Sequence, residues 1–446
     1  MFLEKWIYDK IDTGKDGITR KDLEEYQLSR LKRTLDFVYE KSTFYQRLFD
    51  KAGIKPDDIQ ALRDLRNLPF TNSSDLAESP YTFLCVSLAD VERIYTLSTG
   101  GTTGPPKKIF FTEKDISSII EYMGAAFTTV AILGGIGSSG YKTALFLPDT
   151  GPAGQAGLLA RGVEKNGGTA FKMDISLSYQ EHLELIKEIK PDILFGSVTR
   201  FWRFTQELGQ TNKLSEIGVK VVFTTSEYMP QAMKDRIRDA WGCDVYHHYG
   251  MTEMGFGGPV ECNAHNGFHA NEAEFLFEIV DPVTGHTVNA GDEGELVFTT
   301  LNREGMPLIR YRTGDLTRLI TEPCECGTLT LHRIDRIEKR IVSIVKLESG
   351  DGIYPSMFAD VICTVPGVID YETVLSRDGN VDCLILTVEM AGEDAGILEK
   401  VIDKVSQIPV IRENIKTGVV TVKTTPAKPG ELRRLGRAKK TIVDRR

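Results

Sequence analysis

RIYTLSTGGTTGPPKK, residues 93–108, joins a β-strand pattern to a glycine-rich turn that ends in two lysines. The first six residues favour a strand because they are rich in β-branched and aromatic side chains. Glycines let the backbone approach a ligand closely, so consecutive amides can turn toward an anion while hydroxyl groups add donors. The sequence therefore predicts a phosphate-binding loop, whose candidate ligands are Ser98, Thr99, Gly100, Gly101, Thr102, Thr103, Gly104 and Lys107.

The spacing within this loop differs from that of the Walker nucleotide loop. That pattern requires Gly, four residues and then Gly-Lys before a Ser or Thr, whereas here Gly104 is followed by two prolines. A kinase-like or GTPase-like site is therefore disfavoured. A flexible surface linker is the alternative interpretation, and the paired lysines and the strand-like Ile109–Thr112 argue against it.

The surrounding pattern is typical of an α/β protein. Between about residues 90 and 300, β-rich runs such as DILFGS, KVVFTT and CDVYHHY alternate with helical stretches. We therefore expect a large N-terminal domain with mixed, mainly parallel sheets flanked by helices, and ligands beyond the C-terminal ends of the strands. EFLFEIV and GELVFTTL, separated by a turn sequence, add an antiparallel β subdomain.

The two ends of the chain have their own patterns. One-sided apolar spacing predicts a single helix over Lys21–Lys51 that ends near Gly53. After about residue 340, the strands CLILTVEM and GVVTVKTT and the helix between them predict a small α+β C-terminal domain. The expected boundary separates residues 1–338 from residues 339–446. The uncharged stretch Met123–Tyr141 is broken by Gly, Thr and Ser, which indicates a buried helix and a loop rather than a membrane span.

Composition disfavours several partners and compartments. A net charge of −9 gives no general attraction to nucleic acid or to an anionic membrane, so we expect neither as a partner. The opening MFLEKWIYDKID lacks the build of a secretory signal. Seven cysteines, an odd number, fit a reducing compartment better than a disulfide framework, and we expect a cytoplasmic protein.

Two later motifs place carboxylates where a nucleotide would need them. Glu253 ends the segment Tyr249-Gly250-Met251-Thr252-Glu253, and a carboxylate after a glycine turn at a strand end is a reasonable Mg²⁺ ligand. Asp315 lies in the segment YRTGDL, and one carboxylate can accept two hydrogen bonds from the vicinal hydroxyls of a ribose.

Together the loop and the two motifs, in this order, resemble the adenylate-forming superfamily of acyl-CoA synthetases, luciferases and peptide-synthetase adenylation domains. The resemblance implies that residues 1–338 bind ATP and an acid, and that residues 339–446 form a mobile domain. It also implies that Tyr249 packs on adenine, Thr252 meets a phosphate, Glu253 holds magnesium and Asp315 binds ribose.

Segments along nearly the whole chain are similar to the phenylacetate–coenzyme A ligase branch of that superfamily. They include LRDLRNLPFT, ECNAHNGFH, GELVFTTLNREGMPLIRYRTGDL and CECG. In this branch a short Gly-Ala-Glu-like turn lies near adenine and the acyl pocket. Thr225-Ser226-Glu227 occupies its place here, so Ser226 and Glu227 become candidate nucleotide contacts.

Two short pairs of soft donors lie some sixty residues apart in the sequence: Cys262 with His269, and Cys324 with Cys326. Three thiolates and one imidazole suit a closed tetrahedral zinc site with a structural role. Buried packing cysteines are the alternative, although these residues lie in tight turns such as NAHNGFH and EPCECG. His265 and His332 are the other histidines that could replace His269.

The C-terminal motifs depart from the branch pattern. The branch carries a Gly-Lys pair whose lysine assists adenylation, whereas this chain has Gly436-Arg437, with Lys439 and Lys440 close behind. Arginine keeps the charge as a planar fork rather than a compact ammonium. Arg340 matches the branch's hinge arginine and is a candidate ribose or phosphate contact, with Arg333 as the other alignment, but the hinge carboxylates are replaced.

The resemblance thus implies an ATP-dependent enzyme that converts an aryl or arylacetic acid to an acyl adenylate and transfers it to coenzyme A. Its cofactors would be ATP, Mg²⁺, coenzyme A and structural Zn²⁺, with Glu253, Arg437 and Lys439 as catalytic residues. Similar enzymes are often dimers, so a homodimer is one expected state. The alternatives are an adenylate-forming ligase with an amine, carrier-protein thiol or hydroxyl acceptor, and a nucleotide- or acyl-binding protein without turnover.

Overall fold

The structure is a computed structural model that describes residues 1–11, 17–97, 107–149, 154–209, 211–392, 394–428, 430–432 and 440–446. Its contacts divide the chain into two compact units. The first comprises Met1–Lys172 and Tyr246–Arg336, and the second comprises Met173–Val245 and Ile337–Arg446. The expected boundary at residue 338 lies close to this division, but residues 173–245 group with the C-terminal residues. The two-domain division with a mobile second domain stays a prediction.

The N-terminal region consists of helices rather than the single helix that its periodicity predicts. Helix α1 spans Phe2–Ile11, α2 spans Arg20–Lys41 and α3 spans Thr43–Ala52. The prediction of one helix over Lys21–Lys51 is wrong because Ser42 is extended (φ −96°, ψ 116°) and ends α2, while its hydroxyl accepts from the amide of Tyr45 and begins α3. The predicted end at Gly53 is confirmed, since this residue is left-handed.

Helix α5 (Glu113–Leu133) is the core helix of the first unit. Among the described helices it alone has the length and hydropathy of a membrane span, and 72% of that apolar window is buried inside the protein. The amide of Leu3 in α1 donates to Thr129 in α5 at 2.9 Å. The expectation of a buried helix that runs into a loop is confirmed, because α5 ends at Leu133 and the segment to Tyr141 is irregular.

Sheets of the first unit carry most of the predicted motifs. Strands β1 (Arg93–Leu97) and β2 (Lys107–Phe111) are antiparallel and flank residues 98–106. Strands β3 (Lys142–Phe146) and β4 (Thr169–Lys172) are parallel, with α6 (Gln155–Lys165) between them in the chain. An antiparallel series follows, in the order β7 (Asp244–His248), β8 (Val260–Glu261), β9 (Phe268–His269), β14 (Arg333–Ile334) and β13 (Leu319–Ile320).

The predicted antiparallel subdomain lies in the same unit. It consists of β10 (Phe275–Val280), β11 (Gly294–Thr300) and β12 (Tyr311–Thr317), each antiparallel to the next. The register between β11 and β12 shifts between Glu295 and Val297. Such irregularities re-aim side chains at functional sites, and here the shift falls opposite the strand that carries Asp315.

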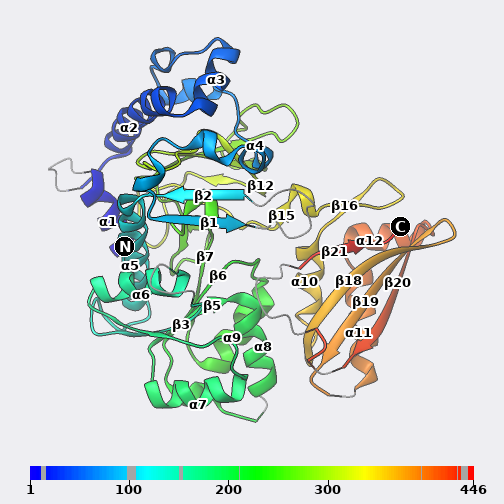
Figure 1. Cartoon of the computed structure of the whole chain (residues 1–446). Helices are drawn as coiled ribbons and strands as arrows, with labels where there is room; N and C mark the ends of the chain where they lie inside the picture. Colours follow the sequence, from blue (N-terminus) through cyan, green and yellow to red (C-terminus); the bar gives the residue numbers. More distant parts are fainter. Residues whose placement is uncertain are drawn as a thin grey trace. The chain divides into compact units, whose positions relative to one another are not determined.

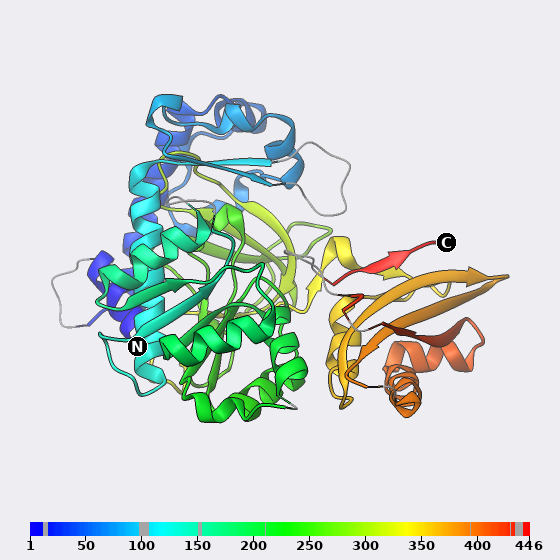
Figure 2. The ribbon, with the colours of Figure 1, turned by 60° about the horizontal axis from the view of Figure 1, so that its bottom comes forward.

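The second unit combines a parallel strand pair with the small C-terminal sheet. Strands β5 (Ile193–Ser197) and β6 (Val221–Thr225) are parallel, and the helices around them are α7 (Tyr179–Ile189), α8 (Val198–Leu208) and α9 (Gln231–Trp241). The C-terminal sheet has the order β20 (Val420–Ala427), β19 (Val381–Met390), β18 (Val368–Asp378) and β21 (Ile442–Asp444). Helices α11 (Ala395–Ser406) and α12 (Pro409–Lys416) cover one of its faces (Figures 1 and 2).

A buried ion-pair cluster explains why residues 173–245 group with the C-terminal residues. Arg203 of α8 pairs with Asp370 of β18 at 2.9 Å and with Glu389 of β19 at 2.8 Å, and all three side chains are nearly inaccessible. The predicted fold class is confirmed: mixed sheets flanked by helices, an antiparallel β subdomain and a small α+β C-terminal region.

Candidate functional site

Glu253 lies at the centre of a buried polar cluster. It sits in the short 3₁₀ turn Thr252–Met254, directly after the strand end that carries Tyr249 and Gly250. Its Oε1 forms an ion pair with Lys107 of β2 and accepts a hydrogen bond of 2.9 Å from the hydroxyl of Tyr311. Lys107, Glu253 and Tyr311 are 7%, 2% and 1% exposed, so the carboxylate is held without help from solvent. The structure thus brings two sequence-predicted residues, Lys107 and Glu253, together.

Tyr311 was not singled out by the sequence as a site residue. The signal that could have identified it is its position four residues before Asp315 on β12, since side chains four apart along a strand point to the same side. Strand β12 therefore carries one of the predicted carboxylates, Asp315, and contacts the other, Glu253, through Tyr311.

Asp315 meets the other predicted nucleotide residue, Tyr249. The Tyr249 hydroxyl donates to Oδ2 of Asp315 at 2.7 Å, and the Asp315 side chain is nearly inaccessible. Its amide donates to the Thr313 hydroxyl at 3.0 Å, within the same strand. A charge-assisted hydrogen bond of this length fixes the orientation of the carboxylate. Tyr249, expected at adenine, and Asp315, expected at ribose, are thus in direct contact.

A histidine packs beneath the turn between Tyr249 and Glu253. The ring of His248 is buried, and its Nε2 lies 3.2 Å from the carbonyl oxygen of Phe256. A Cβ on Gly250 would lie 2.8 Å from that ring, which explains the need for glycine in this motif. Burial, with a smaller contribution from neighbouring His247, lowers the pKa of His248 to about 3, although the hydrogen bond to the Phe256 carbonyl opposes the shift. His248 is therefore a neutral packing residue near neutral pH.

The predicted residues of the second unit are arranged around β6 and the C-terminal region. Ser226 has φ +81°, a strained conformation for a non-glycine residue. Glu227 accepts from the backbone amide of Thr199 at 2.8 Å, and burial raises the pKa of its carboxyl, whereas that hydrogen bond and Lys440 oppose the rise. Arg340 is partly buried in the short strand β15 (Lys339–Arg340).

Most of the residues predicted for the phosphate loop and for the C-terminal catalytic motif lie outside the described residues. They are Ser98, Thr99, Gly100, Gly101, Thr102, Thr103, Gly104, Arg437 and Lys439. The next residue of the tail, Lys440, is described. Its ammonium pairs with Asp370 and donates to the carbonyl oxygen of Tyr371 at 2.6 Å, so it binds within the second unit.

The four predicted zinc ligands converge. Ligand atoms of Cys262, His269, Cys324 and Cys326 all lie within 4.8 Å of one another. The sulfur atoms of Cys262 and Cys324 are 3.6 Å apart, and Sγ of Cys326 is 3.3 Å from Nε2 of His269. These separations fit a tetrahedral site, in which thiolates at about 2.3 Å from zinc lie about 3.7 Å apart.

The alternative zinc histidines lie elsewhere. His265 faces Glu261 at 3.3 Å, and His332 faces Glu272 at 3.5 Å. His269 is therefore the histidine of the cluster, and its ring is fully buried. Arg333, the alternative to Arg340, donates instead to the carbonyl oxygens of Asn266 and Glu322, so it ties together the two loops that carry the cysteines.

A family model and curated proteins both match this chain. Residues 89–302 match the family model described as AMP-binding enzyme. The chain is 30% identical over 434 residues to a phenylacetate-coenzyme A ligase of Thermus thermophilus, covering 93% of this chain and 95% of that protein. It is 32% identical over 437 residues to the corresponding ligase of Aromatoleum evansii, covering 96% of each.

A solved structure has the same fold. The crystal structure of 2-hydroxyisobutyryl-CoA ligase in the postadenylation state aligns with a TM-score of 0.80 at 22% identity, covering 95% of this chain and 90% of that chain.

Proposed function

This chain belongs to the phenylacetate–coenzyme A ligase family, and on that premise we propose which acid it uses and how its residues act. The enzyme activates a carboxylic acid with ATP to an acyl adenylate and transfers the acyl group to coenzyme A. We propose an aryl or arylacetic acid as the substrate, because the curated relatives that match almost the full chain are named for phenylacetate.

The nucleotide would be held by strand β12 and the turn opposite it. Asp315 has its carboxylate oriented by Tyr249 at 2.7 Å, and a vicinal diol could bond to the same carboxylate. Lys107 would meet phosphate charge, together with the amides and hydroxyls of residues 98–104. The observation that carries the proposal is the pair of contacts from one strand, Tyr311 to Glu253 and Asp315 to Tyr249.

Glu253 would hold the magnesium ion. The donor fits, because Mg²⁺ is bound through one or two carboxylates together with substrate phosphates, and only Oε1 of Glu253 is engaged by Lys107 and Tyr311. When bound, magnesium neutralises charge on the phosphates of ATP. The chain's own part is alignment: a carboxylate is a weak nucleophile, so its attack on the α-phosphorus depends on fixed geometry.

The second unit would supply the remaining contacts. We propose that Ser226, Glu227 and Arg340 contact the nucleotide and that Arg437, with Lys439 beside it, supplies the cation of the adenylation step. The support is the alignment of Gly436-Arg437 with the family's Gly-Lys pair. Residues 339–446 would act as the mobile domain that serves both half-reactions.

Pyrophosphate release with a panel of acids, with and without coenzyme A, tests the whole proposal. We expect release with arylacetic or aryl acids, and thioester only when coenzyme A is present. Release without thioester would indicate another acceptor, and tight ATP binding without release would indicate a binding protein. Arg437→Lys is the companion variant: a fall in pyrophosphate release would show that the arginine is functional.

The Cys262–His269–Cys324–Cys326 cluster is proposed to bind structural zinc. The support is the donor set and its spacing, with no ligand position left open for catalysis. Metal analysis of the purified protein should give one zinc per chain, lost in the Cys324→Ser variant.

The compartment and the assembly state complete the proposal. No disulfide joins the described cysteines, which fits the cytoplasm. A homodimer stays a prediction that sedimentation would test.

A further inference from the structure

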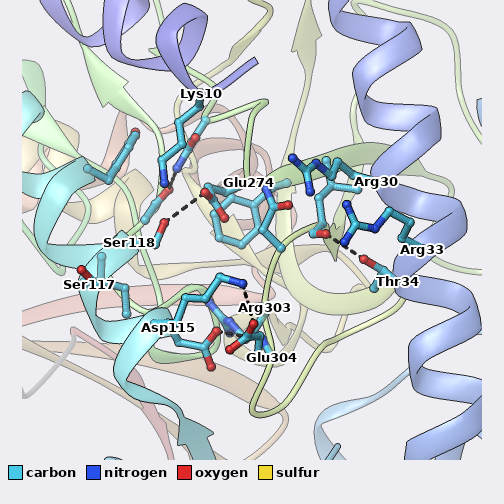
Figure 3. A pocket seen from close by; sticks show the side chains of 18 of the residues that line it. Lys10, Arg30, Arg33, Thr34, Asp115, Ser117, Ser118, Glu274, Arg303 and Glu304 are labelled. Carbon is cyan, nitrogen blue, oxygen red and sulfur yellow. Dashed lines mark hydrogen bonds and ion pairs between the residues drawn. The ribbon is translucent and has the colours of Figure 1, made fainter. Parts of the chain in front are cut away.

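A pocket opens behind the turn that carries Glu253. It has a volume of about 820 Å³ and lies between α2, α5 and the segments around residues 271–275 and 301–304. Figure 3 shows Arg30 and Arg33 on its α2 side, Ser118 and Glu274 opposite, and Arg303 beside Glu304. Among the residues that the structure describes, no proposed ATP contact lines it, and the Glu253 turn contributes Met254 to its wall.

Arg303 links this pocket to the turn. Its Nη1 donates to the carbonyl oxygen of Glu253, and its Nη2 donates to that of Met254 at 3.0 Å. The guanidinium lies 4.9 Å from the centre of the Phe111 ring. Within the described residues, Arg303 has no carboxylate partner at ion-pair distance. Both terminal nitrogens of its guanidinium instead donate hydrogen bonds to backbone carbonyl oxygens.

The same turn is fixed on its other side. A Cβ on Gly255, which has φ +66°, would lie 2.8 Å from both Phe111 and Ile119, so the turn packs tightly on β2 and α5. Lys107 and Tyr311 hold the Glu253 side chain, whereas Arg303 holds its backbone. The side-chain and backbone contacts cannot replace each other, because the direction of a carboxylate is fixed only when its main chain is fixed as well.

We propose that Arg303 is a positioning residue that fixes the Glu253 turn from behind, and that the pocket gives its guanidinium position access from solvent. The inference rests on the proposed role of Glu253 as the magnesium ligand. A planar fork suits two adjacent carbonyls, and a lysine ammonium would satisfy them less well. Residues behind a metal ligand commonly contribute about 10- to 100-fold to metal affinity or activity.

Chemical rescue tests the proposal. We expect Arg303→Ala to weaken Mn²⁺ binding in the presence of ATP, measured by electron paramagnetic resonance, and to slow pyrophosphate release, each by about 10- to 100-fold. Methylguanidinium should restore both at least in part, because it can enter the vacated position from the pocket. Methylammonium at equal ionic strength should restore neither, and Arg303→Lys should lie between the wild type and Arg303→Ala.

Two controls separate this role from general stability. Arg33→Met alters the same pocket without touching the turn, and it should leave Mn²⁺ binding and rates unchanged. If Arg303→Ala proves unfolded in thermal melting, Arg303→Lys carries the test through its Mn²⁺ affinity. Wild-type Mn²⁺ affinity in a folded Arg303 variant, or a loss that methylguanidinium does not reverse, would overturn the inference.

The Glu253→Gln variant distinguishes a failure of the positioning role of Arg303 from a failure of the proposed magnesium role of Glu253. If Glu253→Gln binds Mn²⁺ and ATP like the wild type, the magnesium role of Glu253 fails. If Glu253→Gln loses Mn²⁺ binding but Arg303→Ala keeps it, only the role of Arg303 fails.

Discussion

The first unit contains two buried clusters that differ in what neutralises their negative charge. The Cys262–His269–Cys324–Cys326 cluster gathers soft donors whose ligand atoms face one another, and its thiolates would be balanced by a metal ion. The Glu253 cluster balances its own carboxylate with Lys107, and Tyr311 completes it. The first cluster should therefore depend on its ion for folding, whereas the second should fold without one and use magnesium only for chemistry.

Removing the ion from the cysteine cluster should have the largest effect on stability. We expect Cys324→Ser, or extraction of zinc by a strong chelator, to lower the free energy of unfolding by about 4 kcal/mol or more. Cys363→Ser is the matched control, since that buried thiol lies outside the cluster. Urea unfolding with and without chelator measures the difference, and equal midpoints would show that the cluster folds without metal.

In the Glu253 cluster, the largest expected effect of Glu253→Gln is on catalysis. We expect pyrophosphate release to fall by about 100- to 1,000-fold, because charge stabilisation at the phosphates is lost. Chelation of divalent ions should abolish wild-type turnover with little change in the urea midpoint, provided that the chelator spares zinc. Turnover close to wild type in Glu253→Gln would refute the assignment of magnesium to this residue.

A double-mutant cycle can measure the interaction energy between Glu253 and Lys107. Glu253→Gln alone leaves the Lys107 ammonium buried without its partner, and Lys107→Met alone leaves a buried carboxylate, so each should cost about 3 kcal/mol. The double variant should recover part of that loss, because no lone charge remains. Free energies of unfolding that simply add would show that the two side chains do not balance each other.

Near pH 6, the smallest effect on stability should come from His248, which lies near the second cluster. Its folded pKa of about 3 is below the ordinary value of 6.5, so the unfolded chain binds the extra proton between these values. Its contribution to stability is complete above pH 6.5 and is lost as pH falls toward 3, by at most about 1.4 kcal/mol per pH unit. Stability curves of His248→Gln should have a correspondingly smaller slope, and an unchanged slope would contradict the assignment.

Local sequence signals were sufficient for the elements but not for every boundary. Strands such as β5, β6, β10 and β11 follow from short β-rich runs between turn signals, as predicted. The break at Ser42 was missed because the apolar face continues across it, so periodicity alone cannot distinguish one helix from two. A serine that can cap the following helix was the available signal.

Sequence alone determined which chemical groups the protein has available: the phosphate-loop composition, the carboxylates Glu253 and Asp315, and the soft donors of the cysteine cluster. Residue type and short spacing carry that information, because they fix which ions a segment can bind. Only the tertiary structure decided the partners: Tyr311 for Glu253, Tyr249 for Asp315, Arg303 behind the turn, and His269 rather than His265 or His332 for the cysteines. These contacts join residues that are far apart in the chain, and no local pattern encodes which distant strand or loop will fold against which.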